Sequence, residues 1–194
     1  HSMGSMIVRK YIAKYDNKID GLIVCGSPSK NVNAKLGLAI VKIMEIFKGE
    51  KYRSKFVKNL MFNGYGKKDN LKNSWICNNR EIVEKYNEDE LCQYNYTLNG
   101  FENIIRLMID IYNPKIYEKN NLQLPIYFIA GSEDPVISSE KKWYEAQEFL
   151  KSMGYKNINR KLYKNMSHEI LNELENKTVY KDILEWINII IERN

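Results

Sequence analysis

Histidine and cysteine are scarce in this sequence of 194 residues, which has two of the first and three of the second. The cysteines, Cys25, Cys77 and Cys92, are widely spaced and include no C-x-x-C pair. Such a sparse, odd set argues against a disulfide framework and indicates a reducing compartment. We therefore expect a cytoplasmic protein, either free or attached peripherally to a membrane.

A zinc site is not expected, because metal-ligating side chains do not cluster in the sequence. His168-Glu169 resembles the start of an H-E-x-x-H motif, but Asn172 occupies the position of the second histidine. We expect neither a metal nor a cofactor.

No apolar run approaches the roughly 20 residues that span a membrane, so an integral membrane protein is not expected. The net charge is +6, but the lysines are spread along the chain among Asp and Glu. Without an arginine cluster or a repeated aromatic platform, this charge predicts no nucleic-acid partner.

Strand-like and helix-like patterns alternate on both sides of a long central region. Residues 19–26 and 125–131 are apolar runs bounded by turn residues, as in strands buried on both faces, and residues 157–163 predict a third strand through Ile158 and Leu162. The alternation predicts an α/β fold with a parallel sheet.

Three helices are expected beside this sheet, each with one apolar face. Residues 6–15 carry Val8, Tyr11, Ile12 and Tyr15 on the expected buried face and Arg9, Lys10 and Lys14 on the other. The helix after residue 131 carries Trp143, Ala146, Leu150 and Met153, and the last helix carries Ile183, Leu184, Ile187, Ile190 and Ile191.

Residues 30–118 have a helical pattern without a strong strand signal, notably over 34–47 and 101–112. We interpret them as a helical cap insertion between core segments 1–29 and 119–194. Between its two best helices the insertion is dense in aromatic residues, namely Phe62, Tyr65, Trp75, Tyr86, Tyr94 and Tyr96.

The first five residues, H-S-M-G-S, match most of the nucleophile elbow G-x-S-x-G. This sharp turn exposes a serine hydroxyl before a helix, and it needs small neighbours because the backbone passes close. Ser2 is then the candidate nucleophile, and the backbone N–H of Met3 at the helix start is a candidate oxyanion donor. The alternative is that residues 1–5 are the remnant of an expression tag.

Asp134 lies in G-S-E-D-P-V, directly after the predicted strand that ends at residue 131. Catalytic groups of open α/β sheets lie beyond the carboxyl ends of the strands. A carboxylate there can orient a histidine, although Asp134 or Glu133 can instead cap the helix that begins near Ser138.

His168 follows the next predicted strand through a short loop, 34 residues after Asp134. One helix and one strand fit in this interval, which places the two loops side by side at the same edge of the sheet. The order Ser2, Asp134, His168 is the order of the α/β-hydrolase triad.

These motifs resemble the α/β-hydrolases of the serine-aminopeptidase-like, monoacylglycerol lipase and lysophospholipase group. The resemblance is carried by residues 1–5, 131–136 and S-H-E-I-L-N-E at 167–173, with D-G-L-I-V-C-G-S at 20–27. It implies that Ser2 is the nucleophile, His168 the general base and then acid, Asp134 its orienting partner, and Met3 N–H an oxyanion donor.

Members of this group have strands before the elbow and a loop that supplies a second oxyanion N–H, and the sequence contains neither. We therefore expect a fragment that is inactive alone and has an open sheet edge at its first strand. An N-terminal portion of the same protein, or a second copy that pairs at this edge, is the expected partner.

The resulting hypothesis is a serine hydrolase that cleaves lipid-like carboxylic esters, such as monoacylglycerols or lysophospholipids, with the insertion's aromatic residues around the acyl chain. Ordinary core packing is the alternative for any single aromatic residue. An aminopeptidase or another small-ester hydrolase would have the same triad, and a non-catalytic fragment of the fold is the remaining alternative.

Overall fold

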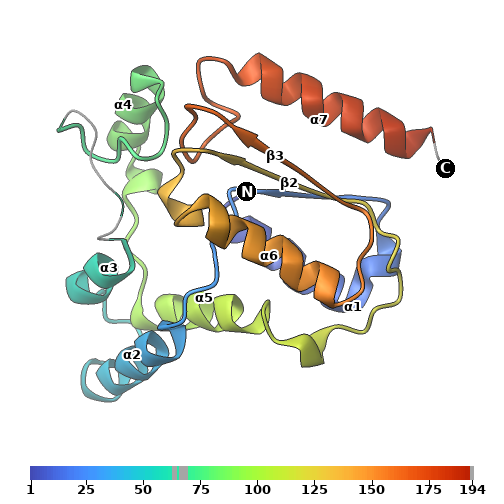
Figure 1. Ribbon diagram of the computed structural model, residues 1–194. Coiled ribbons are helices and arrows are strands. Elements are labelled where there is room, and N and C mark those ends of the chain that lie inside the picture. Colours follow the sequence, from blue (N-terminus) through green and yellow to red (C-terminus); the bar gives the residue numbers. More distant parts are fainter. Residues whose placement is uncertain (63–64, 66–69, 193–194) are drawn as a thin grey trace.

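Three parallel strands form one sheet in the computed structural model, which describes residues 1–62, 65 and 70–192. The strands are β1 (Leu22–Cys25), β2 (Ile126–Gly131) and β3 (Ile158–Tyr163), in the order β1-β2-β3 (Figure 1). Val24 pairs with Phe128, which in turn pairs with Arg160. The predicted α/β fold with a parallel sheet is confirmed.

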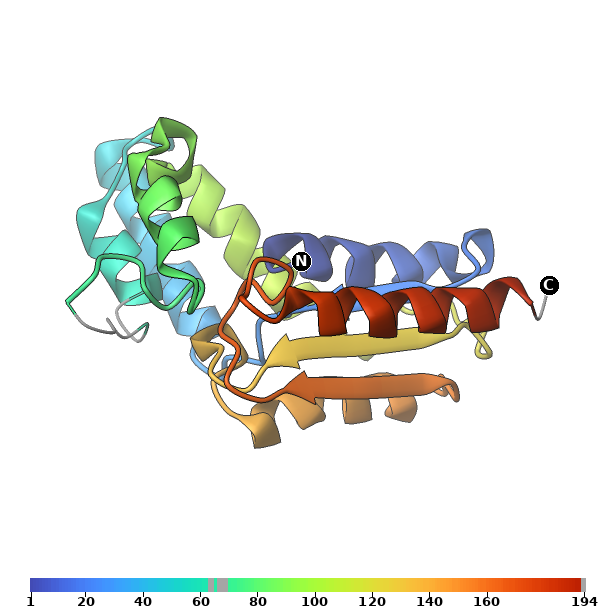
Figure 2. The same ribbon diagram turned by 90° about the horizontal axis from the view of Figure 1, so that it is seen from above.

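Helices cover both faces of the sheet. The α1 helix (Met3–Tyr15) and the α6 helix (Glu140–Ser152) pack on one face, and α7 (Asn176–Ile191) runs along the other (Figures 1 and 2). Trp143, Ala146 and Leu150 of α6 are buried, as the sequence pattern predicts. No helix in the described part of the chain combines the length and apolar character that a bilayer span requires.

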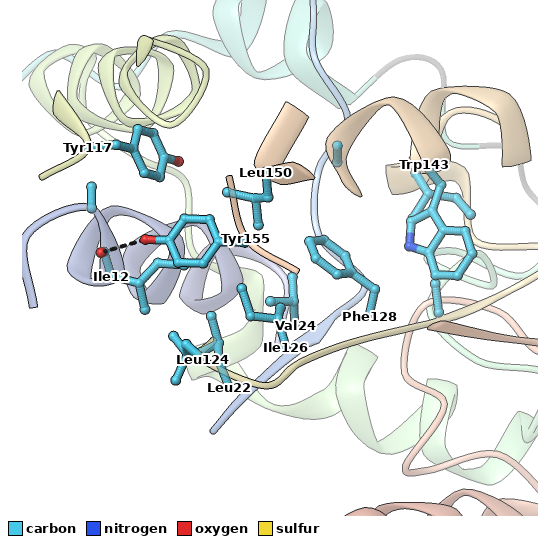
Figure 3. Packing of buried hydrophobic residues seen from close by; sticks show 14 residues of the cluster. Ile12, Leu22, Val24, Tyr117, Leu124, Ile126, Phe128, Trp143, Leu150 and Tyr155 are labelled. Carbon is cyan, nitrogen blue, oxygen red and sulfur yellow. Dashed lines mark hydrogen bonds between the residues drawn. The ribbon is translucent and has the colours of Figure 1, made fainter. Parts of the chain in front are cut away.

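The main core lies between the sheet and the α1–α6 face (Figure 3). Val24 and Phe128 from adjacent strands are fully buried there beside Leu150. The Tyr155 hydroxyl is buried too, and it donates to the backbone oxygen of Ile12 at 3.3 Å and to Asp16 Oδ2 at 2.9 Å. These bonds satisfy a polar group that would be costly to bury alone, and they tie α1 to the segment before β3.

The predicted insertion, residues 30–118, contains α2 (Ala34–Lys48), α3 (Lys55–Phe62), α4 (Arg80–Glu88) and α5 (Leu98–Asp110). Helices α2, α3 and α4 lie beyond the carboxyl ends of the strands (Figure 2), whereas α5 contacts α1 and Tyr117 is buried in the main core. The described residues also form short 3-10 helices, namely Asp16–Lys18, Glu90–Gln93, Pro114–Ile116 and Pro135–Ile137. The described part of the insertion contains no strand. The division of the chain into an insertion and two core segments stays a prediction. Residues 63–64 and 66–69 lie outside the described residues.

The predicted buried face of α1 is confirmed for Val8 and Ile12 and wrong for Tyr11 and Tyr15. Tyr11 and Tyr15 are 42% and 49% exposed, whereas Arg9 is fully buried. The Arg9 guanidinium lies 4.7 Å from the ring centre of Tyr112 and donates to Ser27 Oγ at 3.2 Å. An aromatic ring and a hydroxyl thus stabilise a buried charge, which a hydropathy pattern cannot anticipate.

The predicted stripe of α7 is confirmed for Ile183 and Ile190, and it is wrong for Leu184 and Ile191. Leu184 and Ile191 are 59% and 65% exposed, and the face toward the sheet is made by Val179, Ile183, Trp186 and Ile190. Trp186 stacks on Tyr127 of β2, with the ring centres 5.5 Å apart. Gly21 leaves room for two of these side chains: a Cβ there would lie 2.9 Å from Ile190 Cδ1 and 3.0 Å from Trp186.

Candidate active site

Asp134 and His168 meet at the carboxyl ends of β2 and β3. Asp134 belongs to the loop of residues 132–139, here called the Asp134 loop, and His168 to residues 164–175, the His168 loop. Because β2 and β3 are adjacent and parallel, both loops leave the same edge of the sheet. His168 Nδ1 lies 2.9 Å from Asp134 Oδ2, and both side chains are buried.

The two oxygens of Asp134 have different partners. Oδ1 accepts the backbone N–H of Val136 at 2.8 Å, so Asp134 does cap the short helix Pro135–Ile137. Oδ2 remains for His168, while Ser139 caps α6. The helix expected near Ser138 is therefore capped by Ser139, and Asp134 caps a different, shorter helix while it contacts His168. Since a carboxylate oxygen accepts hydrogen bonds, this contact fits the tautomer that carries its proton on His168 Nδ1.

Gly26, at the end of β1, allows this pair to sit against the sheet. A Cβ on Gly26 would lie 3.2 Å from Asp134 Oδ2 and 3.2 Å from His168 Nδ1 and Cε1. Gly26 also has a φ of 53°, which a larger residue adopts only with strain. The sequence indicates Gly26 only as the end of a strand, and the close approach of Asp134 and His168 to it was not predicted. Its position at the carboxyl end of a buried strand was the feature that could have indicated this approach.

Ser2 has a strained backbone directly before α1. Its φ and ψ are 52° and −123°, a conformation that is rare outside glycine. The Ser2 N–H donates to the Cys25 backbone oxygen at 3.0 Å, and the Ser5 hydroxyl donates to the Ser2 backbone oxygen. These contacts hold the turn next to the end of β1, which is the geometry of a nucleophile elbow.

Ser2 and His168 lie in the same corner of the molecule without a hydrogen bond between their side chains, both residues being described. The residue before Ser2 makes the contact instead: His1 Nε2–H donates to the His168 backbone oxygen at 3.0 Å, and the two imidazole ring centres are 4.4 Å apart. Figure 2 shows the N-terminus beside the loop that precedes α7.

Met3 is the first residue of α1. A backbone N–H in the first turn of a helix has no acceptor within the helix and lies at the positive end of the helix dipole. This position suits an oxyanion donor, which is the role that the sequence predicts for Met3.

Ser2 lines a small apolar hollow of about 120 Å³ under the insertion. Four of the six aromatic residues singled out in the sequence line it as well, namely Phe62, Tyr65, Trp75 and Tyr96. The Trp75 ring lies 5.4 Å from the His168 ring. Tyr86 packs instead in a separate cluster with Val83, and Tyr94 stacks on Arg53. Substrate binding by these aromatic residues stays a prediction.

Burial keeps two other ionisable groups near this site neutral. It raises the pKa of the Cys25 thiol to about 12, so the cysteine beside the elbow is not a thiolate near neutral pH. Burial, followed by the negative charge of Asp134, raises the pKa of Tyr65 to about 12.

Among the described residues there is no group of three His, Cys, Asp or Glu side chains that could hold a metal ion. Asn172, at the place of the second histidine of a zinc motif, donates to the Glu169 carboxylate at 2.6 Å.

Comparison with known proteins identifies relatives along nearly the whole chain. A monoacylglycerol lipase of Mycolicibacterium smegmatis is 22% identical over 187 residues, which are 96% of this chain and 60% of that protein. Among solved structures, a carboxyl esterase from Bacillus coagulans superposes with a TM-score of 0.82 at 28% identity, covering 98% of this chain and 63% of the esterase.

A soluble variant of the monoglyceride lipase from Saccharomyces cerevisiae superposes with a TM-score of 0.71 at 19% identity, again with 98% and 63% coverage. The chain thus spans about 60% of the length of these relatives. The model of one family, described as serine aminopeptidase, S33, matches residues 1–175. On this match the chain belongs to the serine aminopeptidase S33 family and has the α/β-hydrolase fold.

Proposed function

We propose that this chain carries the Ser-His-Asp triad of a serine hydrolase that cleaves lipid-like carboxylic esters. The observation that carries the proposal is the buried contact between His168 and Asp134 beside the strained backbone of Ser2. Strain of this kind persists only where the surrounding structure enforces it, and it concentrates at functional sites. The names of the relatives, a carboxyl esterase and two monoacylglycerol lipases, support an ester as the substrate.

The reaction begins when Ser2 Oγ attacks the acyl carbonyl carbon and its proton moves to His168 Nε2. Asp134 accepts the Nδ1–H of His168 and stabilises the imidazolium that forms. The N–H of Met3 donates to the developing oxyanion. His168 then gives its proton to the departing alcohol, which leaves an acyl ester on Ser2.

Water completes the cycle. His168 takes a proton from the water as its oxygen attacks the acyl carbonyl, and it returns that proton to Ser2 Oγ when the ester bond breaks. The products are one alcohol and one carboxylic acid, and no oxidant or metal takes part in these steps. The apolar lining beside Ser2 favours an acyl chain over a charged group next to the scissile bond.

The test is hydrolysis of a monoacylglycerol and of a nitrophenyl ester by the purified protein, expressed with whatever coding sequence adjoins these residues in its genome. We expect Ser2→Ala and His168→Asn to lower kcat by at least about 10³-fold, and Asp134→Asn by a comparable factor. Ser152→Ala, an exposed serine at the end of α6, is the matched control and should leave kcat unchanged.

Undiminished ester hydrolysis by Ser2→Ala would contradict the proposal. Cleavage of amino-acid nitroanilides in preference to both esters would instead favour an aminopeptidase with the same triad. A folded protein that cleaves neither class would favour the non-catalytic alternative.

A further inference from the structure

Glu173 is a buried carboxylate whose oxygens accept backbone N–H groups. It is 3% exposed, and no lysine or arginine of the described residues forms an ion pair with it. Its Oε1 accepts the N–H of Ser167 at 2.6 Å, and Oε1 and Oε2 lie 3.1 and 3.0 Å from the N–H of Asn78. Bonds from N–H groups to a charged oxygen are strong and compensate for the burial of the charge.

The first of these bonds acts next to the candidate base. Ser167 directly precedes His168, so Glu173 fixes the peptide that carries the imidazole. The His168 loop has only turns and bends between β3 and α7, and no helical or strand ladder holds it. Its shape therefore depends on contacts of this kind.

Asn78 connects the same loop to the helical insertion. Its side-chain amide donates to the backbone oxygen of Asn165 at 2.8 Å and reaches Glu133 Oε2 at 3.4 Å. The Ser167 hydroxyl lies 3.4 Å from Asn78 Oδ1. One side chain of the insertion thus contacts both the Asp134 loop and the His168 loop.

Two neighbours of Asn78 extend this connection to the hollow. The N–H of Glu169 donates to the backbone oxygen of Ile76 at 2.7 Å, directly after His168 in the chain. Trp75, which lines the hollow, lies against the His168 ring. Residues 75–78 are therefore joined by contacts to the loop that carries His168.

We propose that Glu173 and Asn78 are positioning residues that hold the imidazole of His168 in register with the wall of the hollow. Neither side chain lines the hollow beside Ser2; both act through the backbone of the His168 loop. The inference rests on the proposed function, since it assigns these residues to the orientation of its general base. By this inference the insertion, through Asn78, helps to position His168 in addition to covering the hollow beside Ser2.

Glu173→Gln is the informative change because it preserves size and removes one acceptor. Ser167 and Asn78 both present N–H donors, so one end of a glutamine amide must face a donor with its own NH₂ group. Glu175→Gln is the matched control: it is the same substitution two residues later, at an exposed position without a side-chain capping bond.

A fluorophosphonate first titrates the number of reactive sites in each variant. The experiment then measures kcat per titrated site and its dependence on pH. We expect Glu173→Gln to lower kcat per titrated site about tenfold or more and to shift the acidic limb of the pH profile of kcat. The reason is that even a small displacement of the general base strongly lowers the rate of proton transfer. Asn78→Ala should lower kcat less and raise KM for a long-chain ester. An unchanged kcat per titrated site in Glu173→Gln would overturn the inference, since a purely structural role would reduce only the number of sites.

Nuclear magnetic resonance of the imidazole groups gives a reading that does not need activity, since the sequence has only two histidines. We expect the Nδ1–H signal of His168 to shift or broaden in Glu173→Gln and to stay in place in Glu175→Gln. An unshifted signal overturns the inference. Absent labelling of Ser2 in the parent protein would contradict the proposed function alone, and the spectrum would still decide the role of Glu173.

Discussion

The loops that follow β2 and β3 are packed backbone against backbone, whereas the helical insertion is packed side chain against side chain. Gly131, the last residue of β2, lies where a Cβ would be 2.1 Å from the backbone oxygens of Met166 and Ser167 in the His168 loop. In the insertion, Ile46, Phe47 and Leu91 are 79%, 78% and 88% exposed, and most of the buried apolar residues belong to two small clusters.

This difference teaches where the structure tolerates change. A backbone that touches another backbone cannot relax by choosing a new rotamer, so one added atom moves the loop that carries His168. Side chains in a small cluster can readjust, so the insertion should lose stability in proportion to the apolar surface that is removed.

Gly131→Ala should give the largest effect. The added methyl group overlaps two carbonyl oxygens, and β2 or the His168 loop must shift, so we expect the free energy of unfolding to fall by about 3 kcal/mol or more. Urea unfolding measures this loss. Gly37→Ala is the matched control, because a Cβ there meets only Ile105 Cδ1 at 3.9 Å and alanine stabilises a helix interior by up to about 1 kcal/mol. Equal stabilities for the two variants would show that the loops are not packed as described.

Leu98→Ala should come second. Leu98 is fully buried at the start of α5 in the cluster with Phe101 and Val41. We expect a loss of about 2 kcal/mol, the low end for buried leucines, because the small cluster can close part of the cavity. Chemical denaturation monitored by tryptophan fluorescence measures it. A loss larger than that of Gly131→Ala would reverse the contrast between the two regions.

The buried thiol of Cys25 predicts a smaller, pH-dependent effect. Burial raises its pKa from 9.0 to about 12, so above pH 9 the unfolded chain loses a proton that the folded chain keeps. Deprotonation then favours unfolding, and this thiol alone should lower the free energy of unfolding on the order of 1 kcal/mol at pH 10 relative to pH 8. Comparison of urea midpoints for the parent and Cys25→Ala isolates the contribution; identical pH dependences would show that this thiol ionises freely in the fold.

Leu91→Ala should have the smallest effect. Leu91 is 88% exposed, and its removal should change the free energy of unfolding by no more than about 0.5 kcal/mol. The same urea series measures it. A loss comparable with that of Leu98→Ala would mean that another surface covers this part of the insertion in solution.

Apolar patterns predicted the strands but missed contacts between residues far apart in the sequence. Ile126–Gly131 is buried at every residue, and β3 was predictable from Ile158 and Leu162, which pack against the main core although most of β3 is only partly buried. Trp186 of α7 was missed because its stacking on Tyr127 is visible only in three dimensions. Arg9 was placed outside because its partner Tyr112 lies more than a hundred residues away.

The same distinction applies to the candidate site. Asp134 and His168 were predictable, because each directly follows a strand and adjacent parallel strands end together. Glu173 and Asn78 were not, because they contact backbone groups of the loops that no residue pattern specifies. For Gly26, the position at the end of a strand was predictable from the sequence, but the close approach of Asp134 and His168 to it was not.

The central claim is that the strained serine at the start of α1 is an activated nucleophile. Intact-mass measurement of the protein, expressed with whatever coding sequence adjoins these residues in its genome, before and after a fluorophosphonate and with Ser2→Ala beside it, tests this claim directly. We predict one adduct per chain, located on Ser2 and absent from Ser2→Ala. A folded protein that gains no adduct, or an adduct that persists in Ser2→Ala, would contradict it.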